Sequence, residues 1–386
     1  MRNAKLIRLG LVLFLLMLLL TIACNDGGDS SGHPSATKPT TAVSDDRATK
    51  SKTETTTLTA LPKTLTIVDS MQRTVKIPYP LKRIALLAGT VGEIIRALGE
   101  TDRIVGITQD MASKTEYWAE LQDKPVCGSI SQPNYEKIAE LDPDVVIVFG
   151  PWNWNPELEQ KLSAAGITVV ALECFQPATL AQDVMIVGKM LGREKEADAF
   201  VTFFRSYLDA VKEGLDRIPA NERKQVYHEW GHDYSSSGPG SSWDEAIAMA
   251  GGVNIFADSD MAYPTVSPEA VLIRNPQVVI KTLFSGKNGG YPAADAKELT
   301  KVHKTLLSRT GWQNLDAVKN EQVYVISSAL GYGAMRVVSI CYLAKIFYPE
   351  RFTDLDPQAM LREYLERFQG QHRTRLGSES LQQVFR

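Results

Sequence analysis

The sequence repeats one pattern in its two halves, and this repeat constrains the fold more than any other feature. A glutamate stands six residues before a glycine in 93–99 and again in 245–251, with mainly apolar residues between. A second shared segment follows each: a short helical pattern that includes Glu136 or Glu269, then a proline, then an apolar run. Each half therefore predicts a short helix followed by a buried strand. Two similar lobes from one chain imply a cleft between them, and ligands commonly bind in such clefts.

Residues 1–24 have the anatomy of a lipoprotein signal peptide. Arg2, Lys5 and Arg8 give a positively charged start, residues 11–20 form an apolar run, and a small alanine precedes Cys24. We expect cleavage before Cys24 and lipidation of this cysteine. The alternative is a retained transmembrane anchor, for which the apolar run is slightly short. Both interpretations place the body of the protein in the cell envelope of a bacterium, extracytoplasmic and attached to a membrane.

Residues 25–61 are expected to form a disordered tether. The segment 25–60 has no aromatic residue and is dense in Ser, Thr, Asp, Lys and Gly, so it cannot bury a core. The root-mean-square end-to-end distance of a flexible chain of n residues is roughly 5–6 Å × √n, which gives about 30–36 Å for these 36 residues. Such a tether would let the folded part move near the membrane without leaving it.

The charge balance argues against a nucleic-acid partner. The net charge is −3, and removing residues 1–23 takes away three basic and no acidic residues, which gives −3 − 3 = −6. A mildly acidic body without a basic cluster is a poor partner for nucleic acid or for an anionic membrane surface. Three cysteines follow Cys24, and their scattered positions favour buried free thiols at Cys127, Cys174 and Cys341 over a disulfide framework, with a Cys127–Cys174 bond as the alternative.

Alternating apolar segments predict an α/β fold with parallel sheets. Short apolar runs typical of strands alternate with segments that have helical spacing, which indicates sheets with helices on their faces. The alternation stops at residues 194–217, where apolar residues recur every three or four positions and predict one long amphipathic helix. The expected organisation is a signal peptide (1–24), a tether (25–61), an N-terminal binding lobe (62–191), a connecting helix (192–219), a C-terminal binding lobe (220–370) and a frayed tail (371–386).

Several segments in order resemble a known family, the periplasmic binding proteins for iron complexes and cobalamin. They extend over about residues 64–370, and the resemblance lies in their order rather than in any single motif. The segments are 65–78 (LTIVDSMQRTVKIP), 93–107, 142–147 (DPDVVI), 250–256 (AGGVNIF), 266–269 (VSPE) and 275–280 (NPQVVI).

The resemblance implies two Rossmann-like lobes joined by a single long α-helix, with the ligand cleft between the lobes. It further implies a monomeric substrate-binding subunit of an ATP-driven importer, without enzymatic activity or a cofactor of its own. One glutamate on each lobe would then contact the permease subunit of the importer, and Glu93 and Glu245 match those positions. As ordinary exposed first-turn glutamates they would instead only favour the helix dipole. Asp244 is a neighbour able to share the role of Glu245.

One motif points to a different class of protein. His228, Glu229 and His232 match the zinc-protease pattern of two histidines four residues apart with a glutamate between them. That chemistry requires a helix, whereas this segment follows a β-like run and contains Gly231. On an extended chain, residues four apart lie roughly 13 Å apart, too far to share one ion. A zinc-dependent hydrolase is therefore the alternative function, and a structural or adhesive surface lipoprotein is a third class.

The loops expected at the cleft are rich in aromatic residues, which favours a large planar or macrocyclic ligand. The sequence predicts an iron complex, either a siderophore or haem, with cobalamin or another corrinoid as the alternative. The lack of an arginine cluster weakens the case for a strongly anionic siderophore. For haem, the candidate axial ligands are Met111, His228, His232 and Tyr234. The candidate ligand-binding residues are Trp152, Trp154, Phe175, Trp230, His232, Tyr234, Tyr263, Tyr291, Tyr332 and Arg336.

Overall fold

The computed structural model describes residues 63–150, 154, 156–284, 296–331, 333–370 and 384–385. The expected signal peptide, Cys24 and the expected tether lie outside these ranges. In the part of the chain that is described, no helix has the length and apolar character that crossing a membrane requires.

A four-stranded parallel sheet forms the centre of the first lobe, and a short antiparallel pair, β1–β2, accompanies it. The strand order is β4-β3-β5-β6. Its strands are nearly continuous apolar runs, which suits a parallel sheet covered on both faces. The strands are β1 (Thr64–Val68), β2 (Thr74–Pro78), β3 (Ile84–Leu87), β4 (Ile104–Gly106), β5 (Val145–Phe149) and β6 (Thr168–Leu172); the helices are α2 (Gly89–Ala97), α3 (Gln109–Ser113), α4 (Tyr135–Glu140), α6 (Pro156–Ala164) and α7 (Leu180–Leu191).

The second lobe repeats this plan around a sheet of order β11-β10-β9-β7-β8. The strands β7 to β10 pair in parallel, as the repeat in the sequence predicts. The strands are β7 (Gln225–Trp230), β8 (Val253–Asn254), β9 (Val278–Leu283), β10 (Val323–Ser327) and β11 (Val384–Phe385); the helices are α9 (Ser242–Met249), α10 (Pro268–Arg274), α11 (Ala296–Leu307) and α12 (Asp316–Lys319).

The last strand contradicts one expectation from the sequence. Val384 and Phe385 form β11, which pairs antiparallel with Ile326 and Val325 of β10. The prediction of a frayed C-terminal tail is therefore wrong for these two residues. An edge pairing of two residues leaves almost no periodic signal in a sequence, because its partner lies far away in the chain.

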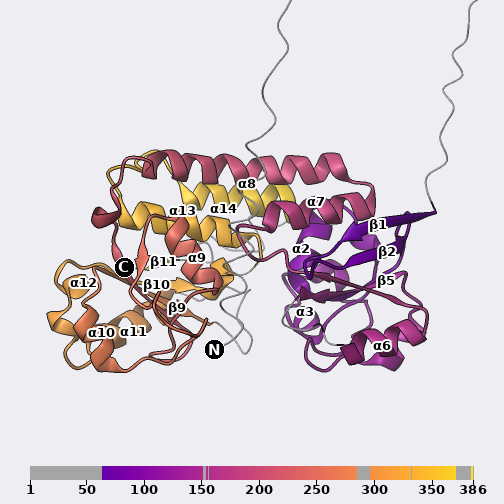
Figure 1. Ribbon diagram of the computed structural model, residues 1–386, viewed down its shortest axis with the longest axis horizontal. Helices are drawn as coiled ribbons and strands as arrows, with labels where there is room; N and C mark the ends of the chain where they lie inside the picture. The colour runs from indigo at the N-terminus through magenta and orange to yellow at the C-terminus, as the bar shows by residue number, and fades with distance from the viewer. Residues whose placement is uncertain are drawn as a thin grey trace, which may run out of the picture. The chain divides into compact units, whose positions relative to one another are not determined.

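A single long helix, α8 (Glu194–Leu215), connects the two lobes (Figure 1). Its buried face consists mainly of the periodic apolar residues that predicted it, among them Phe200 and Phe204. The helix packs against α7 of the first lobe and against α13. Gly192 separates α7 from α8 in a left-handed conformation with φ of 67°, which glycine adopts without the strain of a Cβ atom. The C-terminal helices are α13 (Met335–Phe347) and α14 (Pro357–Phe368).

Helix α14 returns to the first lobe and to the connecting helix. The ring of Phe200 in α8 lies 6.3 Å from that of Tyr364 and 5.0 Å from that of Phe368, measured between centroids. The Tyr364 hydroxyl lies 3.4 Å from Oε2 of Glu93 in α2, and Nε2 of Gln369 donates to the Glu93 carbonyl at 3.1 Å. The chain's last helices therefore form part of the packing of its first lobe.

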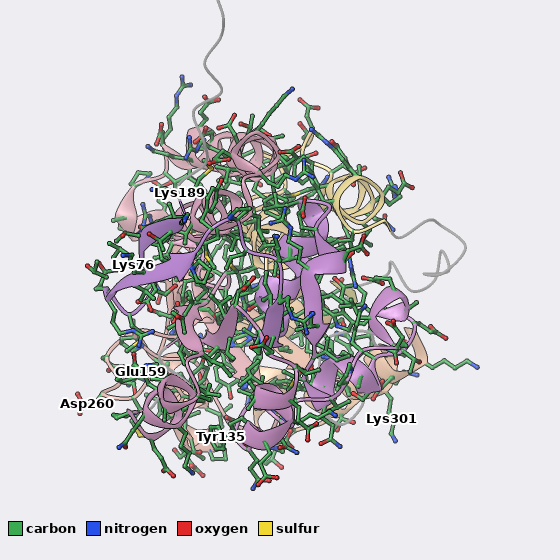
Figure 2. All side chains as sticks on the ribbon, turned by 90° about the vertical axis from the view of Figure 1, so that its right-hand side faces the viewer. Lys76, Tyr135, Glu159, Lys189, Asp260 and Lys301 are labelled. Carbon is green, nitrogen blue, oxygen red and sulfur yellow. The ribbon has the colours of Figure 1, made fainter. Side chains whose placement is uncertain are left out.

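The structure shows where the thiol groups and the charged side chains of the described residues lie. Cys127, Cys174 and Cys341 are free and buried, which confirms the expected free thiols among the described residues. Charged side chains lie at the periphery: Lys76, Asp260 and Lys301, labelled in Figure 2, are all exposed. Several charged side chains are buried exceptions, among them Glu93, Glu229, Lys281 and Arg336, which are described below.

Candidate ligand-binding site

His228 in β7 is buried and fully bonded. Its Nδ1 lies 2.7 Å from the Ser237 hydroxyl and its Nε2 lies 2.9 Å from the Thr282 hydroxyl. The imidazole stacks on Trp243 with centroids 4.4 Å apart. Burial, reinforced by the charges of Arg336 and Lys281, lowers the pKa of His228 well below its usual value. A neutral imidazole with both nitrogens bonded to hydroxyl groups has no lone pair free for a metal.

Glu229, the next residue, is buried in a network of cations. Its carboxylate accepts from Lys281 Nζ at 2.5 Å and from both terminal nitrogens of Arg309 at 2.8 and 3.0 Å. The Tyr227 hydroxyl and the backbone N–H of Tyr234 also donate to it, each at 2.9 Å. Burial raises the pKa of Glu229, but its bonds and charge interactions with Arg309 and Lys281 outweigh this and lower it below its usual value. The carboxylate is therefore ionised and saturated with donors.

This geometry contradicts the zinc-hydrolase alternative. The motif lies on a strand and a loop rather than on a helix, so His228 and His232 do not share a helical face. His228 is committed to two hydroxyl groups, and Glu229 is committed to two cations, so it cannot act as a general base. A strand places successive side chains on opposite faces, which is why the two neighbours belong to different environments.

At the end of β7, the structure brings three aromatic side chains together. The ring of Trp230 meets that of Phe284 edge-on at 4.4 Å and lies 6.4 Å from that of Tyr263. Phe284 directly follows β9, so the group stands at the carboxyl ends of adjacent parallel strands, where ligands bind in open α/β sheets. Phe284 was not among the predicted ligand-binding residues, because a single aromatic residue directly after an apolar run is typical of the protein core.

The loop after Trp230 carries two further predicted residues. His232 is exposed, and its carbonyl accepts from Lys281 Nζ at 3.2 Å. Tyr234 has φ of 58°, and its ring lies 4.6 Å from the Arg309 guanidinium. Tyr234 also packs against the apolar cluster of the second lobe. Hydrogen bonds from the Tyr234 N–H to Glu229 and from Lys281 to the His232 carbonyl therefore hold the backbone of this loop, while His232 is exposed to solvent.

Arg336, at the start of α13, is fully buried beside aromatic rings of both lobes. Its guanidinium lies 4.1 Å from the centroid of Trp243 and 5.3 Å from that of Phe175. Nη2 donates to the Gly331 carbonyl at 2.7 Å. Burial lowers the pKa of Arg336 to about 9. Trp243, the second residue of α9, was not predicted, because a tryptophan in an apolar helical pattern is typical of a core residue.

The remaining predicted residues divide into two groups. Trp154 packs in the first lobe, where the Arg73 guanidinium lies 5.2 Å from its ring centroid, and the structure does not bring it to Trp230. Met111 is also buried in the first lobe. Trp152, Tyr291 and Tyr332 lie outside the described residues.

The comparison with known proteins decides the family. The sequence pattern of the family described as "Periplasmic binding protein" matches residues 84–330, more than half of the chain. The chain belongs to the periplasmic binding protein family. Members of this family are extracytoplasmic substrate-binding proteins of transporters rather than enzymes. The two parallel sheets and the long connecting helix of this periplasmic binding protein agree with that assignment.

Named relatives differ in the ligands that their names state. The molybdate-binding protein MolA of Haemophilus influenzae is 25% identical over 333 residues, covering 78% of this chain and 90% of MolA. The vitamin B12-binding protein of Vibrio cholerae is 26% identical over 253 residues, covering 65% of this chain and 83% of its own. The crystal structure of the TroA-like periplasmic binding protein FepB of Veillonella parvula has a TM-score of 0.66 at 26% identity and covers 78% of this chain and 95% of its own.

In this periplasmic binding protein, the environment of Glu93 contradicts the expectation of an exposed first-turn glutamate. Glu93 lies in the second turn of α2 and is completely buried. The Tyr117 hydroxyl donates to its Oε1 at 2.7 Å. Burial, opposed by the Tyr117 hydrogen bond and the charges of Arg96 and Lys114, raises the pKa of Glu93 to about 7.

Glu245 is half-buried in the first turn of α9. Its Oε1 accepts from the backbone N–H of Ala178 at 2.9 Å, a contact between α9 and the segment that precedes α7. Burial raises the pKa of Glu245. Neither member of the predicted docking pair is therefore a freely exposed carboxylate.

Proposed function

We propose that the protein is a monomeric lipoprotein, lipidated at Cys24, that captures a metal complex outside the cytoplasmic membrane. It would deliver this complex to the permease of an ATP-driven importer. The preferred ligand is an iron complex, a siderophore or haem, and the alternative is a corrinoid. The observation that carries the proposal is the aromatic group Trp230, Tyr263 and Phe284 at the carboxyl ends of β7 and β9. The name of the Vibrio cholerae relative supports the corrinoid alternative.

Tryptophan fluorescence should respond to a ligand that stacks on Trp230. We expect haem, a ferric siderophore or cobalamin to quench the emission at micromolar concentration. Trp230→Ala should weaken that binding by about three- to tenfold, because an aromatic pair contributes about 0.5–1.5 kcal/mol beyond its buried area. Trp312→Phe, in the buried core cluster of the second lobe, is the control. Tight binding of a bare ion or a sugar, with no response to any of the three complexes, would show that the ligand class is wrong.

Docking to the permease is better assigned to a second pair of repeated glutamates. The pair predicted from the sequence was Glu93 and Glu245. Because Glu93 is buried, this pair lacks one of the two surface charges that docking would require. Glu136 and Glu269 occupy equivalent positions in the repeat and are both exposed. Glu136 lies in the first turn of α4 and Glu269 in the first turn of α10. Each helix is capped at its N-terminus by a side-chain acceptor, Asn134 for α4 and Ser267 for α10. We propose that these two carboxylates meet cations on the permease.

Replacing Glu136 and Glu269 together by alanine should separate docking from ligand capture. Ligand affinity should stay within about twofold, while uptake by cells should fall at least about tenfold, since exposed interfacial charges act mainly on association and register. Glu140→Ala with Glu350→Ala removes two other exposed glutamates and serves as the control. If uptake instead persists in the first variant and is lost in Glu93→Gln with Glu245→Gln, the original pair is the docking pair.

A further inference from the structure

Buried donors without acceptors gather where α9 and α13 meet. Of the Arg336 guanidinium nitrogens, Nη2 donates to the Gly331 carbonyl, whereas Nε and Nη1 are buried and have no hydrogen-bond partner among the described residues. Arg336 stacks on the ring of Trp243, whose indole Nε1 is also buried and has no hydrogen-bond partner among the described residues. These groups are donors and cannot satisfy one another.

Such an arrangement is costly for a protein that holds no ligand. A buried donor without an acceptor costs about 1–3 kcal/mol, and buried charges are ordinarily paired or bound to a ligand. The ionisable groups whose charges favour the protonated guanidinium are Tyr263 and Glu245. Oε1 of Glu245 already accepts from the Ala178 N–H. Among the described residues, no carboxylate forms a hydrogen bond or an ion pair with the Arg336 guanidinium, whose hydrogen-bond acceptor is the Gly331 carbonyl.

The position of the cluster fits a ligand site. Phe175, from the loop after β6, brings the first lobe to the guanidinium, and Trp243 stands in the first turn of α9, where the helix dipole favours an anion. Gly331, the last residue of the short 3-10 helix that follows β10 (Ser328–Gly331), contacts the guanidinium through its carbonyl oxygen. A Cβ atom at Gly331 would lie 3.3 Å from Nη2 of Arg336, a tight contact, and 3.4 Å from the Trp243 ring, an ordinary van der Waals contact.

We propose that Arg336 and the Trp243 indole N–H bind an acidic oxygen group of the transported ligand. This inference rests on the proposed function and narrows it to ligands with an anionic end. The group belongs either to a free tetrahedral oxyanion or to an organic metal complex, for example the propionate carboxylates of haem. In the second case, the acid group would bind at Arg336 while the rest of the complex contacts the aromatic group around Trp230.

Matched probes that differ in their acid groups test the proposal in the full chain. Molybdate represents the free oxyanion, and haem represents the acid-bearing complex. Haem dimethyl ester, whose propionates are esterified, and an uncharged ferric hydroxamate lack the acid group. Arg336→Gln should weaken binding of the acid-bearing probe at least about tenfold and leave the acid-free probes within about twofold. Trp243→Phe keeps an aromatic ring, although a smaller one, and removes the N–H, so it should weaken binding of the same probe about three- to tenfold.

Two further variants separate binding from folding. Arg336→Lys keeps the charge and should recover part of the lost affinity. Arg96→Gln removes another arginine that stacks on a tryptophan, Trp118, and should leave all affinities unchanged. Circular dichroism tests whether each variant is folded.

The outcomes distinguish the inference from the function on which it rests. Micromolar binding of molybdate that Arg336→Gln abolishes supports the inference with a free oxyanion as the source, but it contradicts the metal complex of the proposed function. The same result with haem alone supports both the inference and the proposed function, with the acid group on a metal complex. Equal losses for acid-bearing and acid-free complexes, or no loss for either, would overturn the inference and leave the proposed function standing. Failure of every probe to bind would overturn the proposed function itself.

Discussion

Glu229→Ala is expected to lower the free energy of unfolding by about 3–5 kcal/mol, a large effect for one residue. The side chain is fully buried, and its two oxygens hold Lys281 and Arg309. Without the carboxylate, two cations remain with little solvent around them, and the donors from Tyr227 and Tyr234 lose their acceptor. Urea denaturation at neutral pH measures the change.

Asp233→Ala is the matched control within the same network. Asp233 also contacts Arg309, at 2.6 Å, but its side chain is 68% exposed, so its loss should cost less than about 1 kcal/mol. Glu229→Gln keeps the volume and some acceptor capacity and should fall between the two. Equal small effects at Glu229 and Asp233 would contradict the view that Glu229 neutralises the buried cations.

Glu93→Gln is expected to remove a large part of the pH dependence of stability between about pH 4.5 and 7. Burial raises the pKa of Glu93 from 4.5 to about 7, so the folded state holds the proton in a range where the unfolded state releases it. Stability is therefore highest below pH 4.5 with respect to this group and is lost as the pH rises towards 7. At about 1.4 kcal/mol for each pH unit, the difference between 4.5 and about 7 corresponds to roughly 3 kcal/mol.

The measurement is the difference in unfolding free energy between wild type and Glu93→Gln at pH 5 and at pH 8. The charged and titratable groups around Glu93 are Arg96, Lys114, Tyr117 and Tyr364, and they are the same in both proteins. The difference should shift in favour of the glutamine variant by roughly 3 kcal/mol on going to the higher pH. Glu116→Gln, at an exposed position next to Tyr117, should show no such shift. Parallel curves for wild type and Glu93→Gln would refute the assignment.

Local patterns in the sequence predict most of the fold. The short helix and the following strand that the repeat predicts in each half are α4 and β5 in the first lobe and α10 and β9 in the second. These segments combine clear periodicity with a proline or a polar residue at their ends. The long helix was predicted for the same reason, because its apolar spacing persists for 22 residues. The repeat then predicted two similar lobes.

The candidate site depends on contacts that the sequence does not encode locally. Glu93 has the pattern of a surface glutamate, but its carboxylate is buried in contact with Tyr117, 24 residues away, and Tyr364, 271 residues away. Arg336 and Trp243 are separated by most of the second lobe, so their stacking has no local signal. One clue was present: Lys281 interrupts a buried apolar strand, which predicts a buried acidic partner. Glu229 on the adjacent strand is that partner.

The return of α14 to the first lobe has a consequence for the order in which the molecule is completed. During synthesis, α2 and α8 leave the ribosome long before residues 357–369, which supply Tyr364, Phe368 and Gln369 to them. Until then, the Phe200 ring and the Glu93 carboxyl group lack these neighbours, whatever the state of the first lobe's own sheet. The N-terminal half is thus finished by the C-terminal end, and a nascent chain stalled before residue 357 presents an incompletely packed first lobe to chaperones and proteases.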